Sequence, residues 1–152
     1  MRITVVNNQK AQASLAEVRR ICDVLRAFGA QVTQHTLQPS EDLTGAVCDA
    51  PDLIVAVGGD GTIIHAAQDA VAHDIPVVGI NAGRLGFLAE VEPNEIGQLS
   101  RLLTGDYRVH RRMLLEAVFT SPKKKTSYLA VNDIVISDGT RARIVDLEVY
   151  CM

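Results

Sequence analysis

The sequence predicts an α/β fold, in which a three-layer domain built on a parallel sheet is followed by the start of an antiparallel β domain. Short apolar runs rich in β-branched residues alternate with amphipathic segments over residues 1–103, which is the order that parallel βαβ units produce. Beyond Tyr107 the β-branched runs continue with no helical pattern between them, as in antiparallel strands. We therefore expect an α/β domain over residues 1–104 and a partial β-rich domain over residues 105–152.

The first part of the α/β domain is expected to begin with a strand at Ile3–Asn7 and an amphipathic helix at Ser14–Phe28. The helix is predicted from apolar residues spaced three and four positions apart, namely Leu15, Val18, Ile21, Cys22, Leu25 and Phe28. Gly29 follows where a helix C-cap belongs. A short second strand is expected at Gln31–Thr36.

Two further strands are each followed by a glycine-rich loop. Leu53–Val57 and Pro76–Asn81 have the apolar, β-branched composition of strands buried on both faces of a parallel sheet. A polar loop with a short helix is expected at Pro39–Pro51, and a helix from Thr62 to about His73. A further helix is expected from Glu92-Pro93 to about Leu103. The segment Thr104-Gly105-Asp106 is expected to end that helix. Ligands of such sheets bind beyond the carboxyl ends of the strands, where both glycine loops fall.

The second domain is expected to contribute three strands, at Tyr107–Thr120, Thr126–Ser137 and Ile144–Tyr150. The basic run Lys123-Lys124-Lys125 follows Ser121-Pro122, so we interpret it as the solvated tip of a hairpin. The chain stops inside the last predicted strand, and three strands with apolar residues on both faces do not close a domain. We therefore expect a chain that is cut short.

Composition excludes several classes of function. The chain has 152 residues, of which 47% are hydrophobic and 22% charged, with a formal net charge of −3. This is ordinary globular composition, and the acidic balance disfavours a nucleic-acid surface. No apolar run approaches the roughly 20 residues that span a bilayer, and the chain enters a strand pattern at once without a signal peptide. We expect a cytoplasmic protein with no membrane or nucleic-acid partner.

Cysteines and histidines show no metal-ligand spacing. The three cysteines and four histidines form no Cys-x-x-Cys and no zinc-type pair. Free thiols in a reducing compartment are the simplest interpretation. We therefore expect no protein-bound metal site.

The loop Gly58-Gly59-Asp60-Gly61-Thr62 is the most informative segment. Its three glycines let backbone N–H groups approach a ligand with no Cβ in the way, and Thr62 is predicted to cap a helix whose N-terminus favours phosphate. Asp60 would repel phosphate unless it meets Mg²⁺ or a sugar hydroxyl. Neither a P-loop nor a Gly-x-Gly-x-x-Gly motif occurs. The segment therefore indicates a phosphate-binding loop with one carboxylate available for chemistry; a tight turn after a core strand is the alternative.

Two further motifs follow in order, Gly79–Leu88 (GINAGRLGFL) and Ala130–Ile136 (AVNDIVI). Together with the first loop they resemble the NAD kinase family over nearly the whole chain. The first loop is also similar to that of diacylglycerol, sphingosine and 6-phosphofructokinases, whereas the second motif is much more specific to NAD kinases. Members of that family run to nearly twice this length, so the resemblance implies an incomplete chain with impaired activity.

The resemblance implies phosphoryl transfer to the 2′-hydroxyl of the adenosine ribose of NAD, giving NADP. The resemblance implies that the phosphoryl donor is either ATP, with Mg²⁺ or another divalent cation, or polyphosphate. It also implies that the enzyme is a homo-oligomer. By residue, it implies that Asp60 is catalytic, accepting the ribose proton, and contacts NAD. The other implied NAD contacts are Gly61, His65, Asn132, Asp133 and Arg143.

Less specific interpretations stay open for single residues and for the whole chain. His65 can be a helix residue without a ligand, Asn132-Asp133 a bulge or turn, and Arg143 a solvated charge. The alternative function is a non-catalytic nucleotide-binding or assembly module derived from the kinase, which NADP formation from NAD and ATP distinguishes. A lipid or sugar kinase is disfavoured by the second motif.

Overall fold

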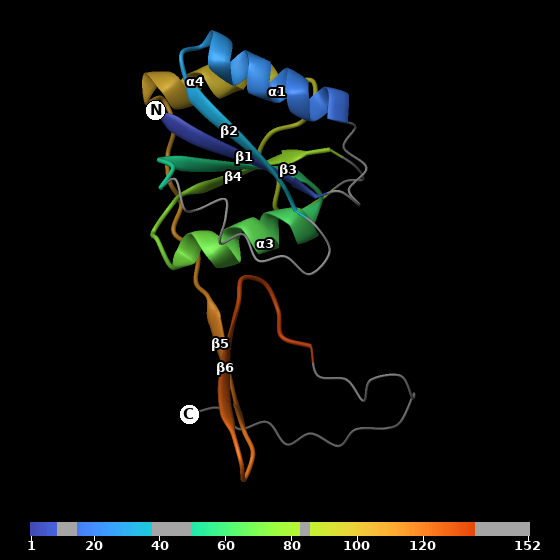
Figure 1. Ribbon diagram of the computed structural model, residues 1–152, viewed down its shortest axis with the longest axis vertical. Helices are drawn as coiled ribbons and strands as arrows, with labels where there is room; N and C mark the ends of the chain where they lie inside the picture. The colour runs from blue at the N-terminus through green and yellow to red at the C-terminus, as the bar shows by residue number, and fades with distance from the viewer. Residues whose placement is uncertain (9–14, 38–49, 83–85, 136–152) are drawn as a thin grey trace. The chain divides into compact units, whose positions relative to one another are not determined.

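The structure is a computed structural model that describes residues 1–8, 15–37, 50–82 and 86–135 (Figure 1). It divides into two compact units, Met1–Arg112 and Met113–Met152. The first unit contains a parallel sheet with helices and the second a two-stranded antiparallel sheet. The predicted fold class is confirmed.

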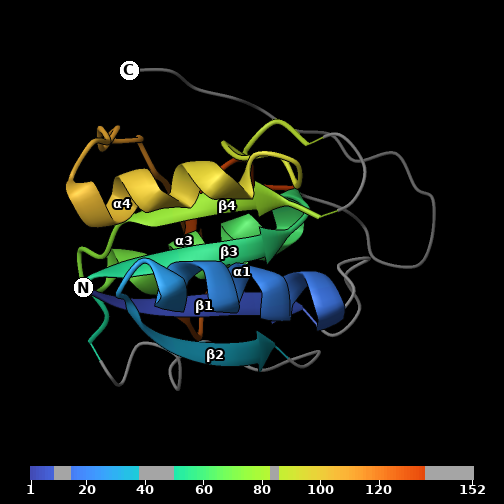
Figure 2. The ribbon, with the colours of Figure 1, turned by 90° about the horizontal axis from the view of Figure 1, so that it is seen from above.

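Four parallel strands form the sheet of the first unit, in the order β2-β1-β3-β4 (Figure 2). They are β1 (Arg2–Asn8), β2 (Gln31–Leu37), β3 (Leu53–Gly58) and β4 (Val77–Asn81). Every residue of β3 is buried, because this strand lies inside the sheet and is covered on both faces. That burial explains its unbroken apolar run.

Helices cover both faces of the sheet, so the unit has three layers (Figure 1). On one face α1 (Leu15–Ala27), the 3₁₀ turn η1 (Ile96–Leu99) and α4 (Ser100–Thr104) pack on residues such as Val5 and Val55. On the other face α3 (Asp60–Val71) packs on Val6, Ile54 and Ala56. Successive strand residues therefore enter two separate cores, as the strand period of two requires.

Helix α1 follows its predicted stripe except at the ends. Val18, Ile21, Cys22 and Leu25 are buried, whereas Leu15 and Phe28 are 60% and 45% exposed. Both lie at the ends of the helix, beyond the part that the sheet covers. Burial raises the pKa of the Cys22 thiol, which favours the protonated, unreactive form.

The last helix of the first unit begins later than the sequence predicts. We expected it from Glu92-Pro93, but η1 starts at Ile96 and passes into α4 at Ser100. The backbone N–H of Glu92 donates to the Glu95 carboxylate at 3.3 Å, and the Glu92 side chain accepts from Asn81. These contacts hold residues 92–95 in a turn. The predicted end is confirmed, since Gly105 adopts φ 74° immediately after α4.

An ion pair joins the starts of β1 and β3. The backbone N–H of Arg2 donates to Asp52 Oδ2 at 2.7 Å and its guanidinium to Oδ1 at 3.1 Å. The backbone hydrogen bond from Arg2, assisted by its side chain, holds the pKa of the Asp52 carboxyl below its usual range. The contact sets the pairing of β1 with β3 from their first residues.

The second unit contains a hairpin of β5 (Leu115–Thr120) and β6 (Lys125–Ala130). Ser121 and Lys124 close its turn through reciprocal backbone hydrogen bonds, and Lys123 and Lys124 are exposed, so the predicted hairpin tip is confirmed. The strands are shorter than expected. Residues 107–114 form no strand, because they have no pairing partner in the described part of the chain, and β6 stops at Ala130.

Two predicted segments, the strand at Ile144–Tyr150 and most of the loop at Pro39–Pro51, lie outside the described residues. Within the described residues, no helix combines the length and the apolar character needed to cross a membrane.

Candidate functional site

The candidate site lies where the order of the strands reverses. From β1 the chain moves to β2 at one edge, and β3 and β4 then extend the sheet in the opposite direction. At such a switch point the loops after the two central strands separate, leaving a crevice beyond their carboxyl ends. The loop Gly58–Thr62 follows β3 at this end of the sheet.

Helix α3 begins two residues earlier than the sequence predicts. Gly59, in an extended conformation, is the N-cap, and Asp60 is the first helical residue. The predicted capping role of Thr62 is wrong, because no side chain caps the helix and the backbone N–H of Thr62 itself donates to Gly59 O at 2.9 Å. Thr62 is buried against Gly58, where a Cβ would collide with its hydroxyl. Thr62 therefore holds the end of β3 close to α3.

The start of α3 offers groups suited to an anion. The first N–H groups of an α-helix have no acceptor within the helix and lie at the positive end of its dipole. Gly59 and Gly61 are exposed, and a Cβ at either would meet nothing within 4 Å. A phosphate oxygen could therefore approach this backbone directly.

Asp60 joins the two glycine loops. Its Oδ2 accepts the backbone N–H of Phe87 at 3.2 Å, and its Oδ1 accepts that of Leu88 at 3.1 Å. Each carboxylate oxygen keeps a second lone pair for a further donor. The carboxylate is thus held in one orientation at the N-terminus of α3, with capacity to accept a hydroxyl proton.

Contacts along β4 anchor the chain on both sides of the second loop. Gly79 lies under α3, where a Cβ would come within 2.5 Å of Ile63 Cδ1, and its N–H donates to Glu90 Oε2 at 3.0 Å. The buried Asn81 donates through Nδ2 to the Glu92 carboxylate at 3.2 and 3.3 Å. The chain on both sides of the loop is therefore anchored to β4.

His65 lies on the exposed surface of α3, four residues after Gly61 and hence on the same helical face. It can reach a ligand bound at the start of the helix. Its predicted contact with NAD stays a prediction.

Asn132 and Asp133 belong to the second unit, and both are exposed. They follow the end of β6, so the predicted strand through them is wrong. The Nδ2 of Asn132 donates to Asp133 Oδ1 at 3.0 Å, which aligns an amide and a carboxylate side by side. Arg143, like Gly83–Leu85 of the second motif, lies outside the described residues.

Residues 86–88 are the part of the site that sequence reasoning missed. The motif was noted, but no role was assigned to these residues. The Phe87 side chain is 94% exposed, while its N–H holds Asp60. An aromatic residue next to a glycine in a loop that follows a buried strand was the available signal.

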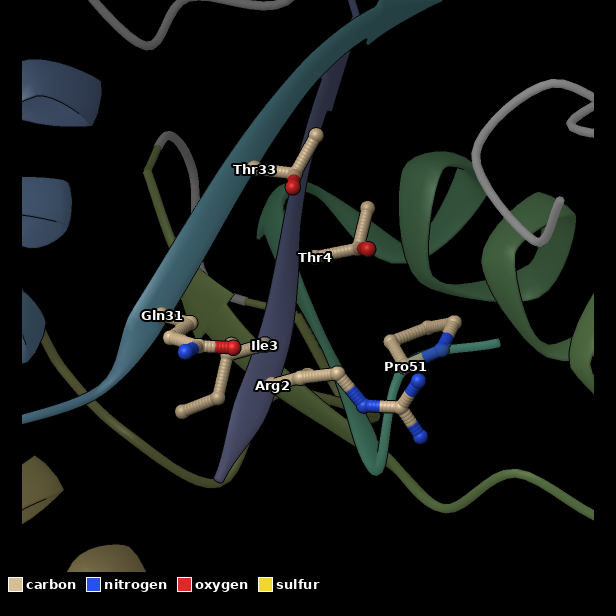
Figure 3. A pocket seen from close by; sticks show the side chains of 6 residues that line it. All are labelled: Arg2, Ile3, Thr4, Gln31, Thr33 and Pro51. Carbon is tan, nitrogen blue, oxygen red and sulfur yellow. The ribbon is translucent and has the colours of Figure 1, made fainter. Parts of the chain in front are cut away.

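The structure also has a hollow away from this site. It measures about 220 Å³ and is lined by residues at the amino-terminal ends of β1 and β2 and by Pro51, namely Arg2, Ile3, Thr4, Gln31, Thr33 and Pro51 (Figure 3). Asp60 follows the carboxyl end of β3, at the opposite end of the strands. The hollow is therefore separate from the glycine loops.

Asp60 offers one carboxylate to a divalent cation that binds together with a phosphate ligand. Across the described ranges, no three carboxylates, histidines or cysteines gather as a metal site. Mg²⁺ commonly binds through one or two carboxylates plus substrate phosphates, and Asp60 beside an anion-binding helix terminus fits that donor set.

Fold and site together define an α/β domain with an oriented carboxylate at the start of the helix that follows β3. A family model described as the ATP-NAD kinase N-terminal domain matches residues 3–107. An NAD kinase of Heliobacterium modesticaldum is 40% identical over 95% of this chain and 53% of its own length. One of Natranaerobius thermophilus is 43% identical over 72% of this chain and 38% of its own. The chain belongs to the NAD kinase family, and it spans about half the length of these curated relatives.

Proposed function

We propose that this chain carries the catalytic carboxylate of an NAD kinase, with the α/β domain over residues 1–104. The reaction transfers a phosphoryl group from ATP to the 2′-hydroxyl of the adenosine ribose of NAD. Family membership and the orientation of Asp60 at the N-terminus of α3 support this proposal. The proposed location is the cytoplasm, and the divalent cation enters with ATP.

The chemical role proposed for Asp60 is that of a general base. As the ribose oxygen bonds to the γ-phosphorus, its proton passes to a free lone pair of the Asp60 carboxylate, and the bond from phosphorus to the bridging oxygen of ATP breaks to release ADP. A positioned general base contributes roughly 10²–10⁴-fold. The rest of phosphoryl transfer is positioning and charge stabilisation, for which the N–H groups at the start of α3 are suited.

The remaining site residues take binding roles in this proposal. Gly58, Gly59 and Thr62 shape the phosphate loop, and Gly61 and His65 contact the dinucleotide from the exposed face of α3. Asn132 and Asp133 offer one donor and one acceptor, a pair that can read vicinal ribose hydroxyls. Arg143 is proposed beside the dinucleotide phosphates, where a cation is favourable.

Asp60→Asn tests the proposal in protein expressed from the complete reading frame that contains these residues. The change is nearly isosteric but removes the base, so we expect kcat for NADP formation to fall by at least ~10²-fold, with a modest change in NAD affinity. Asp74→Asn is the matched control, because this exposed carboxylate lies just past the other end of α3. Near-normal turnover in Asp60→Asn would refute the assignment.

The alternative is a non-catalytic nucleotide-binding module, and it makes a different prediction. Wild-type protein would then bind NAD in calorimetry but form no NADP with ATP and Mg²⁺.

A further inference from the structure

We propose that Gly86, with the backbone N–H groups of Phe87 and Leu88, is a positioning element for Asp60. In this proposal the second glycine loop selects the orientation of the catalytic carboxylate, and only glycine at position 86 permits it. The inference rests on the proposed function, since it gives Asp60 its catalytic role.

Two hydrogen bonds define the orientation. Because Phe87 N–H reaches Oδ2 and Leu88 N–H reaches Oδ1, rotation of the carboxylate about its bond to Cβ would break both. The two donors lie on consecutive residues, and each contacts a different oxygen of the same carboxylate. Charge-assisted hydrogen bonds of this kind are about twice as strong as neutral ones.

Gly86 makes room for this arrangement. A Cβ built at position 86 would lie 2.5 Å from Asp60 Oδ1 and 3.3 Å from its Cγ, well inside van der Waals contact. Gly86 is half-buried and has no positive φ. It is therefore required for space and not for backbone conformation, and any side chain there must displace the carboxylate or the loop.

The backbone is anchored on both sides of the contact, so a side chain at position 86 would be accommodated mainly by rotation of the Asp60 carboxylate away from its two donors. Asp60 is the first residue of α3, whose next turn packs Ile63 against Gly79 of β4. The chain after Leu88 returns along β4, where Glu90 N–H and Val91 N–H donate to Gly79 O at 3.0 and 3.2 Å. A displacement of about 1 Å in a reacting group can cost about 10²-fold in rate, so crowding at Gly86 should reduce catalysis.

A double-mutant cycle tests the contact, with thermal unfolding of the 152-residue chain as the readout. We expect Gly86→Ala to lower the Tm by about 3 °C or more in the parent chain and by much less in Asp60→Ala, where the methyl group has room. Amide hydrogen exchange at Phe87 and Leu88 should accelerate in both single variants. Equal Tm shifts in the two backgrounds would overturn the proposed contact.

Activity tests the positioning role in protein from the complete reading frame. We expect kcat of Gly86→Ala to fall by about 10²-fold while the KM for ATP changes little. Asp60→Glu keeps the negative charge and leaves Gly86 in place, but it moves the carboxylate by one methylene group. We expect a similar fall in kcat for this variant. It tests the positioning role even if Gly86→Ala folds poorly. Gly97→Ala is the matched control, because Gly97 lies in η1 with nothing within 4 Å of an added Cβ.

The outcomes separate this inference from the proposed function. If Asp60→Asn is impaired while Gly86→Ala and Asp60→Glu retain normal kcat, the positioning role is wrong and the proposed function stands. If Asp60→Asn turns over normally, the proposed function fails and the positioning role fails with it.

Discussion

Asp60 and Thr62 stand two residues apart in one loop, and the structure gives them opposite roles. Thr62 is buried and packs on Gly58, whereas the carboxylate of Asp60 reaches across to the second loop. Both side chains are polar, and residue type alone suggested that Thr62 would cap the helix. Thr62 instead has a packing role at the first turn, because the chain has already become helical at Asp60.

At the same scale, the pair Asn132 and Asp133 yields a prediction about binding. Replacing both by alanine should weaken NAD affinity about tenfold, the equivalent of one to two lost hydrogen bonds, as measured by calorimetry. Folding should be preserved, because both side chains are exposed and follow the end of β6.

The control for this pair is Lys123→Ala with Lys124→Ala at the exposed hairpin tip, which should leave NAD affinity unchanged. Unchanged NAD affinity in the Asn132/Asp133 variant, together with a collapsed Tm, would show that the pair is structural.

At the scale of elements, α1 and α3 end with the same backbone arrangement but different residues. After α1, Gly29 N–H donates to Arg26 O at 2.9 Å and Ala30 N–H to Leu25 O at 3.1 Å. After α3, Asp74 N–H donates to Val71 O at 3.3 Å and Ile75 N–H to Ala70 O at 3.2 Å. Gly29 and Asp74 both adopt positive φ, 93° and 52°, which is unfavourable for residues with a Cβ.

We expect opposite effects from exchanging these end residues. Gly29→Ala should destabilise the protein by about 1 kcal/mol, purely through φ, because its Cβ would meet nothing within 4 Å. Asp74→Gly should stabilise it by less than about 1 kcal/mol, since relief of the left-handed conformation is partly offset by glycine's extra freedom when unfolded.

Urea unfolding measures both changes, and Gly97→Ala, at a position without positive φ, serves as the reference. If Gly29→Ala and Asp74→Gly changed the free energy of unfolding in the same direction, this explanation would be contradicted.

For the molecule as a whole, the hairpin of the second unit has an uncovered apolar face. Paired residues of β5 and β6 place the following side chains on one face: Leu115, Ala117, Phe119, Thr126, Tyr128 and Ala130. Phe119 is 62% and Tyr128 60% exposed. A two-stranded hairpin is marginal in water by itself, and exposed apolar patches promote association.

The 152-residue chain is therefore expected to self-associate, with a sedimentation coefficient that rises with concentration. Phe119→Ser with Tyr128→Ser should reduce this association. The matched pair Val118→Ser with Leu129→Ser changes the opposite face of the hairpin, where both side chains are about half exposed, and should reduce it less. A monodisperse monomer at all concentrations would contradict the prediction.

Elements with a local residue pattern can be predicted without the structure. The β3 run Leu53–Val57 and the α1 stripe Val18–Leu25 were predictable, because burial on two faces and burial on one helical face leave different periodicities. Gly29 was predictable as a helix end because glycine readily adopts the positive φ that ends many helices. The family followed from three motifs in order.

The way in which those motifs meet depends on the packing of distant segments. Asp60 and Leu88 are 28 positions apart, and their contact depends on β3 and β4 being neighbours in parallel register. The start of α3 at Asp60, the turn that delays η1 to Ile96, and the space required at Gly86 follow from contacts between segments. A local pattern records which residues are apolar or flexible, but it does not record which distant atom fills the space beside them.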